Sequence, residues 1–166
     1  MNFQCRIKKV RQFLDDKKVD CIVITGSSNI FYLTGLYGIE GSLCITGKGD
    51  IVFFTSGIFY QYVCDKLQSI NIPDFSPEIF DRGLFVKFLK GFKIPALFSS
   101  ESSVRNWKLL CRETEKQIKT IDNFVADMRA IKEDEEIEKI QKAEKITFSV
   151  LKKIKNIIKR LNKNFY

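Results

Sequence analysis

The sequence predicts an α/β fold, in which a mixed β-sheet carries helices on both faces and a long helix follows at the C-terminus. Short apolar runs such as Cys21–Ile24 have no polar alternation, as expected of strands buried between two layers. Segments with apolar residues at helical spacing lie between these runs. Strands that alternate with helices in this way form a layered α/β domain.

The N-terminal segment is predicted to be a helix. Its apolar residues recur at helical spacing, at Phe3, Ile7, Val10 and Leu14. The run 21–24 is then the first strand, and its apolar character on both sides favours parallel pairing. A side-chain oxygen of Ser28 or Asn29 is expected to cap a short second helix, which Gly35 ends.

The middle of the chain continues the alternation. Two runs, 43–46 and 51–54, flank the glycine-rich segment 47–50 and are predicted to form a hairpin. Ser102 or Ser103 is the expected cap of a later helix. By the same patterns we expect helices at 59–67, 84–89 and 104–111, and strands at 71–75, 95–98 and 117–121.

The last part of the chain is predicted to be one long amphipathic helix, with acidic residues at its start and basic residues at its end. The helix dipole favours this order of charges. The apolar stripe needs a partner, so we expect the isolated chain to pair through it or the helix to fray. We therefore divide the chain into a compact α/β domain, 1–127, and a linker helix, 128–166. The stripe consists of Ile137, Ile140, Ala143, Ile146, Val150, Leu151, Ile154, Ile157, Ile158 and Leu161.

Composition excludes several kinds of catalytic site. The 166 residues include no histidine, which removes His-dependent nucleophilic catalysis and every His-containing metal site. The five cysteines are widely spaced and odd in number, which favours small buried thiols over a disulfide framework or a zinc site. No set of carboxylates forms a convincing catalytic group. We expect no catalytic residue and no metal-binding residue in this chain.

The net charge of +8 comes mostly from the C-terminal helix, because residues 128–166 hold 11 Lys and Arg against 6 Asp and Glu. Basic residues interleaved with exposed aromatics, which nucleic-acid binding needs, are not found. A solvated helix face is the better interpretation of this charge. No apolar run approaches the ~20 residues of a membrane span, and charges interrupt the N-terminal segment. We expect a cytoplasmic protein that binds neither nucleic acid nor membrane.

One connection is unusually rich in glycine and aromatic residues. Residues 31–41 contain three of each, between a predicted helix and a predicted strand. Glycine lets a backbone turn sharply or approach another surface, and loop aromatics often line contact surfaces. Spacing alone favours a well-packed connection whose aromatics belong to the core. The alternative of a contact surface stays open, and its candidate residues are Tyr32, Gly35, Tyr37, Gly38 and Gly41.

Two stretches of the chain resemble the creatinase/prolidase N-terminal domain. The first contains RIKKVR at 6–11, DCIVIT at 20–25, NIFYLTG at 29–35 and GIEG at 38–41. The second contains IDNF at 121–124 and MRAIK at 128–132, and it resembles the join to a catalytic domain. The chain departs from the family at Ser56 and Ile58, where an Asp and an Arg are frequent.

The resemblance implies a parent metallopeptidase, an Xaa-Pro aminopeptidase or prolidase. Its pita-bread catalytic domain would follow this chain and bind two divalent metal ions of the Mn, Co or Zn type. This chain would be the non-catalytic N-terminal domain, with its own catalytic domain and a second subunit of a homodimer as partners. The parent would take short proline-containing peptides. Tyr32, Tyr37 and the loop from Gly35 to Gly41 would form a wall that narrows the entrance to its active site.

The resemblance also implies a second function of a different class. Some relatives of this domain act as enzymatically silent modules that bind peptides or proteins. The two functions differ in one observable feature of the whole protein, because only the peptidase needs an intact set of metal ligands.

Overall fold

The computed structural model describes residues 2–70, 72–94, 97–99 and 102–163. The chain divides into two compact units, one from Asn2 to Arg129 and one that begins at Ala130. The first unit contains a sheet with helices packed on it, and the second contains the long C-terminal helix.

Six strands form one mixed sheet in the first unit. Along the chain they are β1 (Cys21–Ile24), β2 (Gly41–Thr46), β3 (Ile51–Thr55), β4 (Phe75–Ile79), β5 (Leu97–Ser99) and β6 (Thr120–Ile121). Their spatial order is β4-β3-β2-β1-β5-β6. Strand β2 runs antiparallel to both neighbours, and the remaining pairs are parallel. All strands except β2 therefore end at the same edge of the sheet, the edge at which β2 begins.

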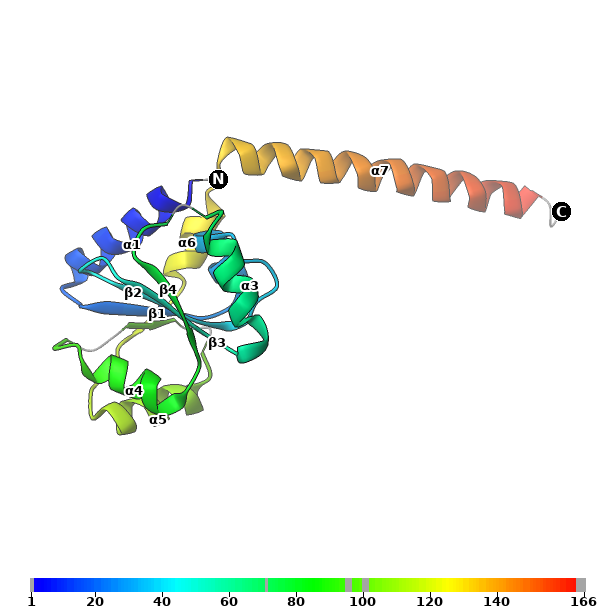
Figure 1. Ribbon diagram of the computed structural model, residues 1–166. Helices are drawn as coiled ribbons and strands as arrows, with labels where there is room; N and C mark the ends of the chain where they lie inside the picture. Colours follow the sequence, from blue (N-terminus) through cyan, green and yellow to red (C-terminus); the bar gives the residue numbers. More distant parts are fainter. Residues whose placement is uncertain (1, 71, 95–96, 100–101, 164–166) are drawn as a thin grey trace. The chain divides into compact units, whose positions relative to one another are not determined.

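Helices cover both faces of this sheet, as the sequence predicts (Figure 1). The helices are α1 (Phe3–Lys17), α2 (Ser27–Thr34), α3 (Gly57–Leu67), α4 (Arg82–Lys90), α5 (Val104–Thr114) and α6 (Phe124–Ala130). The side chains of β1 alternate between two cores. Ile22 and Ile24 belong to the core shared with α1, α2, α3 and α6, whereas Cys21 and Val23 belong to the core shared with α4 and α5. The predicted α/β class, with its mixed sheet, is confirmed.

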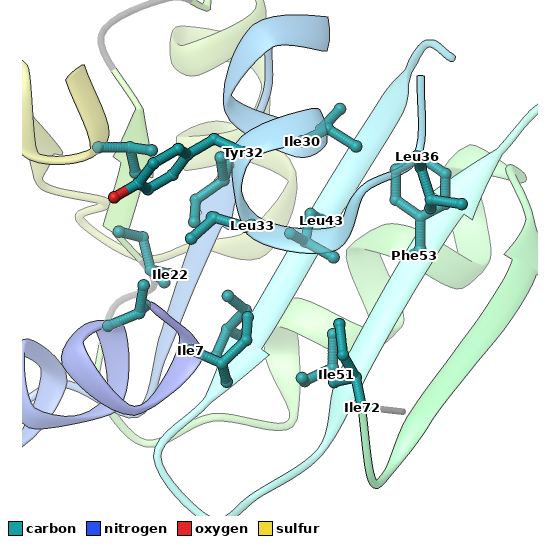
Figure 2. Close-up of a cluster of buried hydrophobic side chains, with 14 of the residues drawn as sticks. Ile7, Ile22, Ile30, Tyr32, Leu33, Leu36, Leu43, Ile51, Phe53 and Ile72 are labelled. Atoms are coloured by element: carbon teal, nitrogen blue, oxygen red, sulfur yellow. The ribbon is translucent and has the colours of Figure 1, made fainter. Parts of the chain in front are cut away.

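The larger core lies between the sheet and the helices that precede and follow β1. Figure 2 shows Ile7 of α1, Ile30 and Leu33 of α2, and Leu43 of β2 gathered in this cluster. These aliphatic side chains are at most 2% exposed. Burial of this kind stabilises a fold by roughly 1.5–3 kcal/mol per large aliphatic side chain.

Two strands differ from the sequence prediction. The strand predicted at 71–75 is instead Phe75–Ile79, and residue 71 lies outside the described part of the chain. Asp74 has a left-handed backbone (φ 58°), which is not a strand conformation, so β4 begins only at Phe75. The carbonyl of Asp74 accepts the N–H of Ile51 at 2.8 Å, which is the first hydrogen bond of the pairing with β3. The strand predicted at 117–121 shortens to Thr120–Ile121, because Ile118 turns into the smaller core.

The remaining predicted strands and helices are close to those observed. The hairpin is confirmed as β2 and β3, and the helices predicted at 59–67, 84–89 and 104–111 correspond to α3, α4 and α5. Of the strand predicted at 95–98, residues 95–96 lie outside the described residues, and β5 spans Leu97–Ser99.

Helix caps follow the prediction in one place and not in another. Ser103 caps α5, because its hydroxyl accepts the N–H of Asn106 at 3.2 Å. The prediction that Ser28 or Asn29 caps α2 is wrong, because Gly26 is the N-cap, with a φ of 87°. The side chain of Asn29 lies one turn further along, where it donates to the carbonyl of Thr25 at 3.1 Å.

Helix α6 is absent from the sequence prediction, although it completes the larger core. It is only 7 residues long, too short for a periodic pattern to stand out. The ring of Phe124 stacks on Phe13 of α1 with centroids 3.9 Å apart, and Val125 is buried beside it.

The cysteines only partly follow the expectation of buried thiols. Cys21 and Cys44 are buried, Cys64 and Cys111 are half-buried, and Cys5 is exposed; all five are free. Burial raises the pKa of the Cys44 thiol well above its ordinary value, and its hydrogen bond with Cys21 raises the pKa further.

The second unit consists of α7 (Asp134–Lys163) and the short segment before it. At its start the N–H of Glu133 donates to Oε2 of Glu136 at 3.0 Å, as in a capping box. The large apolar side chains of the stripe between Ile137 and Ile158 are 40–59% exposed. The side chain of Leu161 lies outside the described residues. None of the described helices is long and apolar enough to cross a membrane.

Candidate functional site

The connection between α2 and β2 begins with a tight helix end. Gly35 adopts a left-handed backbone (φ 77°), and its N–H donates to the carbonyl of Phe31 at 2.7 Å. A side chain on Gly35 would place Cβ only 2.7 Å from Cζ of Phe3. Both the backbone conformation and the close approach of α1 therefore require glycine here.

Beyond Gly35 the loop alternates between anchors and exposed residues. Leu36 and Ile39 are buried, and the N–H of Leu36 is held by the hydroxyl of Thr34 at 3.2 Å. Tyr37 is 76% exposed, and its ring makes a T-shaped contact with Phe31, with centroids 5.8 Å apart. Gly38 has a φ of 70°, and a Cβ added to it would have no neighbour within 4 Å. The loop thus presents Tyr37 and Gly38 on a firmly attached base.

Tyr32 belongs to that base. Its side chain is buried, and its hydroxyl donates to the carbonyl of Met128 at 3.2 Å (Figure 2 shows the hydroxyl at the margin of the cluster). The guanidinium of Arg6 stacks on the ring at 3.8 Å from its centroid, and Nη1 of Arg6 donates to the carbonyl of Tyr32 at 2.8 Å. Tyr32 therefore ties α2 to α1 and α6, and it does so from inside the domain.

Gly41 ends the loop and starts β2. A Cβ at this position would lie 2.5 Å from the carbonyl oxygen of Phe54 and 2.7 Å from Cζ of Phe53. No side chain fits in this space without movement of β3. The structure thus divides the five candidate residues: Tyr32, Gly35 and Gly41 position the loop, whereas Tyr37 and Gly38 form its exposed tip.

An open groove of about 710 Å³ lies beside this loop, at the edge where β1, β3 and β4 end. The first residues of α2 and α3 face it, and neither helix receives a side-chain cap from its N-cap residue. Phe59 and Phe80, which are half-buried and exposed, provide apolar surface, whereas Phe54 is almost completely buried. Serine residues and Glu40 provide polar groups. The lining residues are Gly26, Ser27, Glu40, Gly41, Ser42, Phe54, Thr55, Ser56, Gly57, Phe59 and Phe80.

This combination suits a short extended peptide better than a charged cofactor. Uncapped backbone N–H groups at two helix starts can donate to carbonyl or carboxylate oxygens. The carboxylate of Glu40 can accept an ammonium group, and the phenylalanine rings can pack against apolar side chains. The groove shares Glu40 and Gly41 with the loop, so loop and groove form one candidate site.

Neither the groove nor the packing of Arg6 on Tyr32 beneath the loop was predicted from the sequence. Arg6 is three residues after Phe3 and four before Val10, at the margin of the apolar face of α1, and its charge gave no sign that it would be only 1% exposed. Phe80 and Phe54 come from different parts of the chain, and their meeting with Gly26 depends on the strand order. One signal was available, because Ser56 and Ile58 stand where the family often has a charged pair, and Ser56 lines the groove. Ile58 is exposed.

The described residues do not fit a centre of two divalent metal ions. Such a centre needs several carboxylate or imidazole ligands that converge on one point. Among the described residues no group of three or more His, Cys, Asp or Glu side chains is arranged to hold a metal ion. The whole sequence contains no histidine.

The sequence of residues 6–83 matches the family model of the creatinase/prolidase N-terminal domain. A relative, the Xaa-Pro dipeptidase of Pyrococcus horikoshii, is 30% identical over 139 residues. The matched region covers 83% of this chain but 38% of that enzyme. This chain thus corresponds to well under half the length of the relative.

Solved structures share the fold. The prolidase from Pyrococcus horikoshii OT3 aligns with a TM-score of 0.73 at 24% identity, over 87% of this chain and 40% of that chain. The aminopeptidase P from Streptococcus thermophilus aligns with a TM-score of 0.65 at 22% identity, over 78% of this chain and 99% of that chain. At these identities the structural likeness establishes the fold and not the activity.

Proposed function

We propose that this chain is the non-catalytic part of an Xaa-Pro peptidase and shapes the access of substrates to the active site. The premise is that the compact unit is a creatinase/prolidase N-terminal domain. The relative in Pyrococcus horikoshii is named an Xaa-Pro dipeptidase. The parent of this chain hydrolyses the bond before proline in short peptides, and this domain narrows the way to the site of cleavage.

The observation that carries the proposal is the rigid mounting of an exposed loop tip beside the groove. Tyr37 is exposed, but Leu36 and Ile39 on either side of it are buried. A wall that excludes folded chains must not yield when a large substrate presses on it. Buried anchors on both sides of an exposed aromatic residue provide such a wall.

The reaction itself belongs to another part of the parent under this proposal. That part is a catalytic domain joined through 128–166, and it carries two divalent ions of the Mn, Co or Zn type. This chain alone is therefore not an enzyme. The parent acts as a homodimer in the cytoplasm, in which the loop from Gly35 to Gly41 faces a catalytic domain of its own or of the second subunit.

A domain exchange tests the role in substrate access. Residues 1–129 of this chain replace the matching domain of the Pyrococcus horikoshii Xaa-Pro dipeptidase, and kcat/KM is measured for an Xaa-Pro dipeptide and for longer peptides that begin with Xaa-Pro. We expect Tyr37→Ala in the chimera to raise kcat/KM for the longer peptides relative to the dipeptide. A smaller side chain at the tip opens the entrance.

Lys48→Ala is the matched control. Lys48 is exposed in the turn between β2 and β3, at the opposite edge of the sheet. It should leave the ratio unchanged. The role in access is wrong if Tyr37→Ala and Lys48→Ala give the same ratio. The non-catalytic assignment is wrong if the purified chain alone cleaves Xaa-Pro peptides when Mn²⁺, Co²⁺ or Zn²⁺ is added.

A second candidate function is an enzymatically silent module that binds peptides or proteins. The groove favours it, because its apolar rings and free backbone N–H groups suit a peptide without any catalytic partner. Titration of the isolated chain with an Xaa-Pro peptide, followed by amide shifts of Gly26, Gly41 and Gly57, tests this function. Saturable shifts favour the silent module, and unchanged shifts favour a domain that acts only beside a catalytic domain.

A further inference from the structure

The positive charge of the compact unit is concentrated in one stretch of its chain. Residues 82–120, which include α4 and α5, contain 9 Lys and Arg against 3 Asp and Glu, a net charge of +6. The remainder of the compact unit contains 9 against 11, a net charge of −2. Helices α4 and α5 share the smaller core and lie together on one face of the sheet (Figure 1). The positive charge therefore belongs to one side of the compact unit.

Three cationic side chains follow one another along the exposed side of α5. Arg105, Lys108 and Arg112 are exposed and stand three and four residues apart, which places them on one face of the helix. We call these three residues the basic row, which is about 10 Å long at 1.5 Å per helical residue. An open hollow of about 480 Å³ is lined by the basic row together with Val104 and Leu109. The basic row thus has apolar neighbours on the same surface.

The acidic side chains of α5 and its C-cap pair with α4 instead. Glu113 accepts a hydrogen bond from Nε of Arg82 at 2.9 Å, and Oε1 of Glu115 lies 3.7 Å from Nζ of Lys90. Within the described residues, no ion pair involves the basic row. Because no described carboxylate neutralises these three charges, they remain able to attract an anion from outside the domain.

Helix α5 holds the basic row on a firm base. Leu110 and Thr114 are buried on the opposite side of the helix, each 3% exposed. The indole N–H of Trp107 donates to the carbonyl of Ile118 at 2.7 Å, which ties α5 to the segment before β6. The spacing of the three charges is therefore fixed before a partner binds, which lowers the cost of ordering the site.

We propose that the basic row binds an acidic segment of another protein, one that also carries apolar side chains. Carboxylates of such a segment pair with the guanidinium and ammonium groups. Its apolar side chains pack on Val104, which is 65% exposed, and on Leu109. This surface shares no lining residue with the groove beside the loop. The proposal is independent of the proposed function, because it applies equally to a peptidase domain and to a silent module.

The surface favours a short acidic segment over a nucleic acid. The residues that line the hollow include no aromatic ring on which a base could stack. The basic row is only about 10 Å long, and the remainder of the compact unit has a net charge of −2, which would repel the continuation of a long polyanion. A segment with a few carboxylates meets the positive charge alone.

A titration of the full chain with a short peptide built from Glu and Leu tests the proposal. The amide shifts of residues 104–112 are followed, because they report on α5 separately from α7. We expect saturable shifts and a dissociation constant that rises as NaCl is added, since salt screens the attraction. A peptide with Gln in place of each Glu should leave these amides unchanged. A peptide with Ala in place of each Leu should bind more weakly.

Two double variants separate the basic row from net charge. Arg105→Ala with Arg112→Ala should raise the dissociation constant about tenfold, because two ion pairs with the peptide are lost. The matched control, Lys153→Ala with Arg160→Ala, removes the same charge at the same spacing from α7 and should leave the constant unchanged. Alanine is a strong helix former, so both helices are preserved.

Several results would overturn the proposal. Equal dissociation constants for the two double variants would show that binding follows net charge and not the basic row. Shifts confined to α7 would assign the peptide to that helix. Binding of the Gln peptide, or no loss of affinity with the Ala peptide, would contradict the chemistry of the partner. A short DNA duplex should bind more weakly than the Glu and Leu peptide at the amides of 104–112, and tighter binding would assign this face to nucleic acid.

Discussion

Isoleucine side chains in the core of the compact unit are buried, but those on α7 are exposed. Ile45 of β2 is completely buried, whereas Ile157 of α7 is 56% exposed. Ile45 lies in an apolar run that predicts a strand, and Ile157 lies in the apolar stripe of a predicted helix. The contrast shows that an apolar pattern predicts a secondary-structure element, but burial requires a second surface. The sheet supplies that surface to α1 and α2, whereas the described stripe of α7 stays about half exposed.

The largest expected effect comes from truncating an isoleucine to alanine in each region and comparing the free energies of unfolding. Ile45→Ala should lower the free energy of unfolding of the compact unit by about 2–5 kcal/mol, because it opens a cavity in the core. Ile157→Ala should change it by less than about 0.5 kcal/mol. Urea unfolding, followed by fluorescence of the single tryptophan, Trp107, measures both. Equal losses would refute the separation of the two units.

A smaller loss of stability is expected at Gly41, where the backbone lies close to β3. Gly41→Ala should destabilise the unit by about 1–3 kcal/mol, because its Cβ forces Phe53 and the carbonyl of Phe54 to move. Gly57→Ala is the control. Its Cβ has no neighbour within 4 Å, and alanine favours the first turn of α3. Equal urea midpoints for the two variants would contradict the tight approach at Gly41.

The hydroxyl of Tyr32 should have a still smaller effect. Tyr32→Phe removes the hydrogen bond to the carbonyl of Met128 and should lower stability by about 1 kcal/mol. The ring and its stacking on Arg6 remain. Amide exchange of α6 should become faster in this variant, while exchange of α4 should not. Unchanged exchange in α6 would show that the hydroxyl does not hold this helix.

The smallest effect concerns pH and α7. The hydrogen bond from Lys139 holds the pKa of Glu135 below its ordinary value of 4.5. A depressed pKa in the folded state adds stability above the ordinary value, and this stability is lost as the pH falls through the folded value. The helical signal at 222 nm should therefore decrease slightly from pH 4.5 downward. Glu135→Gln should flatten this part of the curve, and an unaltered curve would exclude the contribution of the pair.

Much of the fold follows from local patterns. The hairpin around 47–50, the helices α1, α3, α4 and α5, and the start of α7 are all encoded by nearby residues. The errors occur where distant residues decide. Strand β4 starts only after the left-handed backbone of Asp74, where it pairs with Ile51 of β3, and α6 packs on α1 through the stacking of Phe124 on Phe13. Neither partner can be inferred from spacing within one segment.

The candidate site shows the same division. The glycines and aromatics of 31–41 mark the connection as unusual, and the family resemblance places it near the substrate in the proposed function. The groove beside it could not be predicted, because its lining residues come from the ends of several strands. Which strands lie side by side depends on the crossover connections of the sheet.

Composition and local periodicity were enough to specify the α/β class, the absence of histidine and the charge-divided, amphipathic helix at the C-terminus. The roles of Tyr32 as a buried support and of Tyr37 as an exposed tip emerged only from the folded arrangement. Both tyrosines belong to the same glycine- and aromatic-rich segment, 31–41. Arg6 and the carbonyl of Met128, far apart along the chain, enclose the first, and the fold brings no such partners to the second.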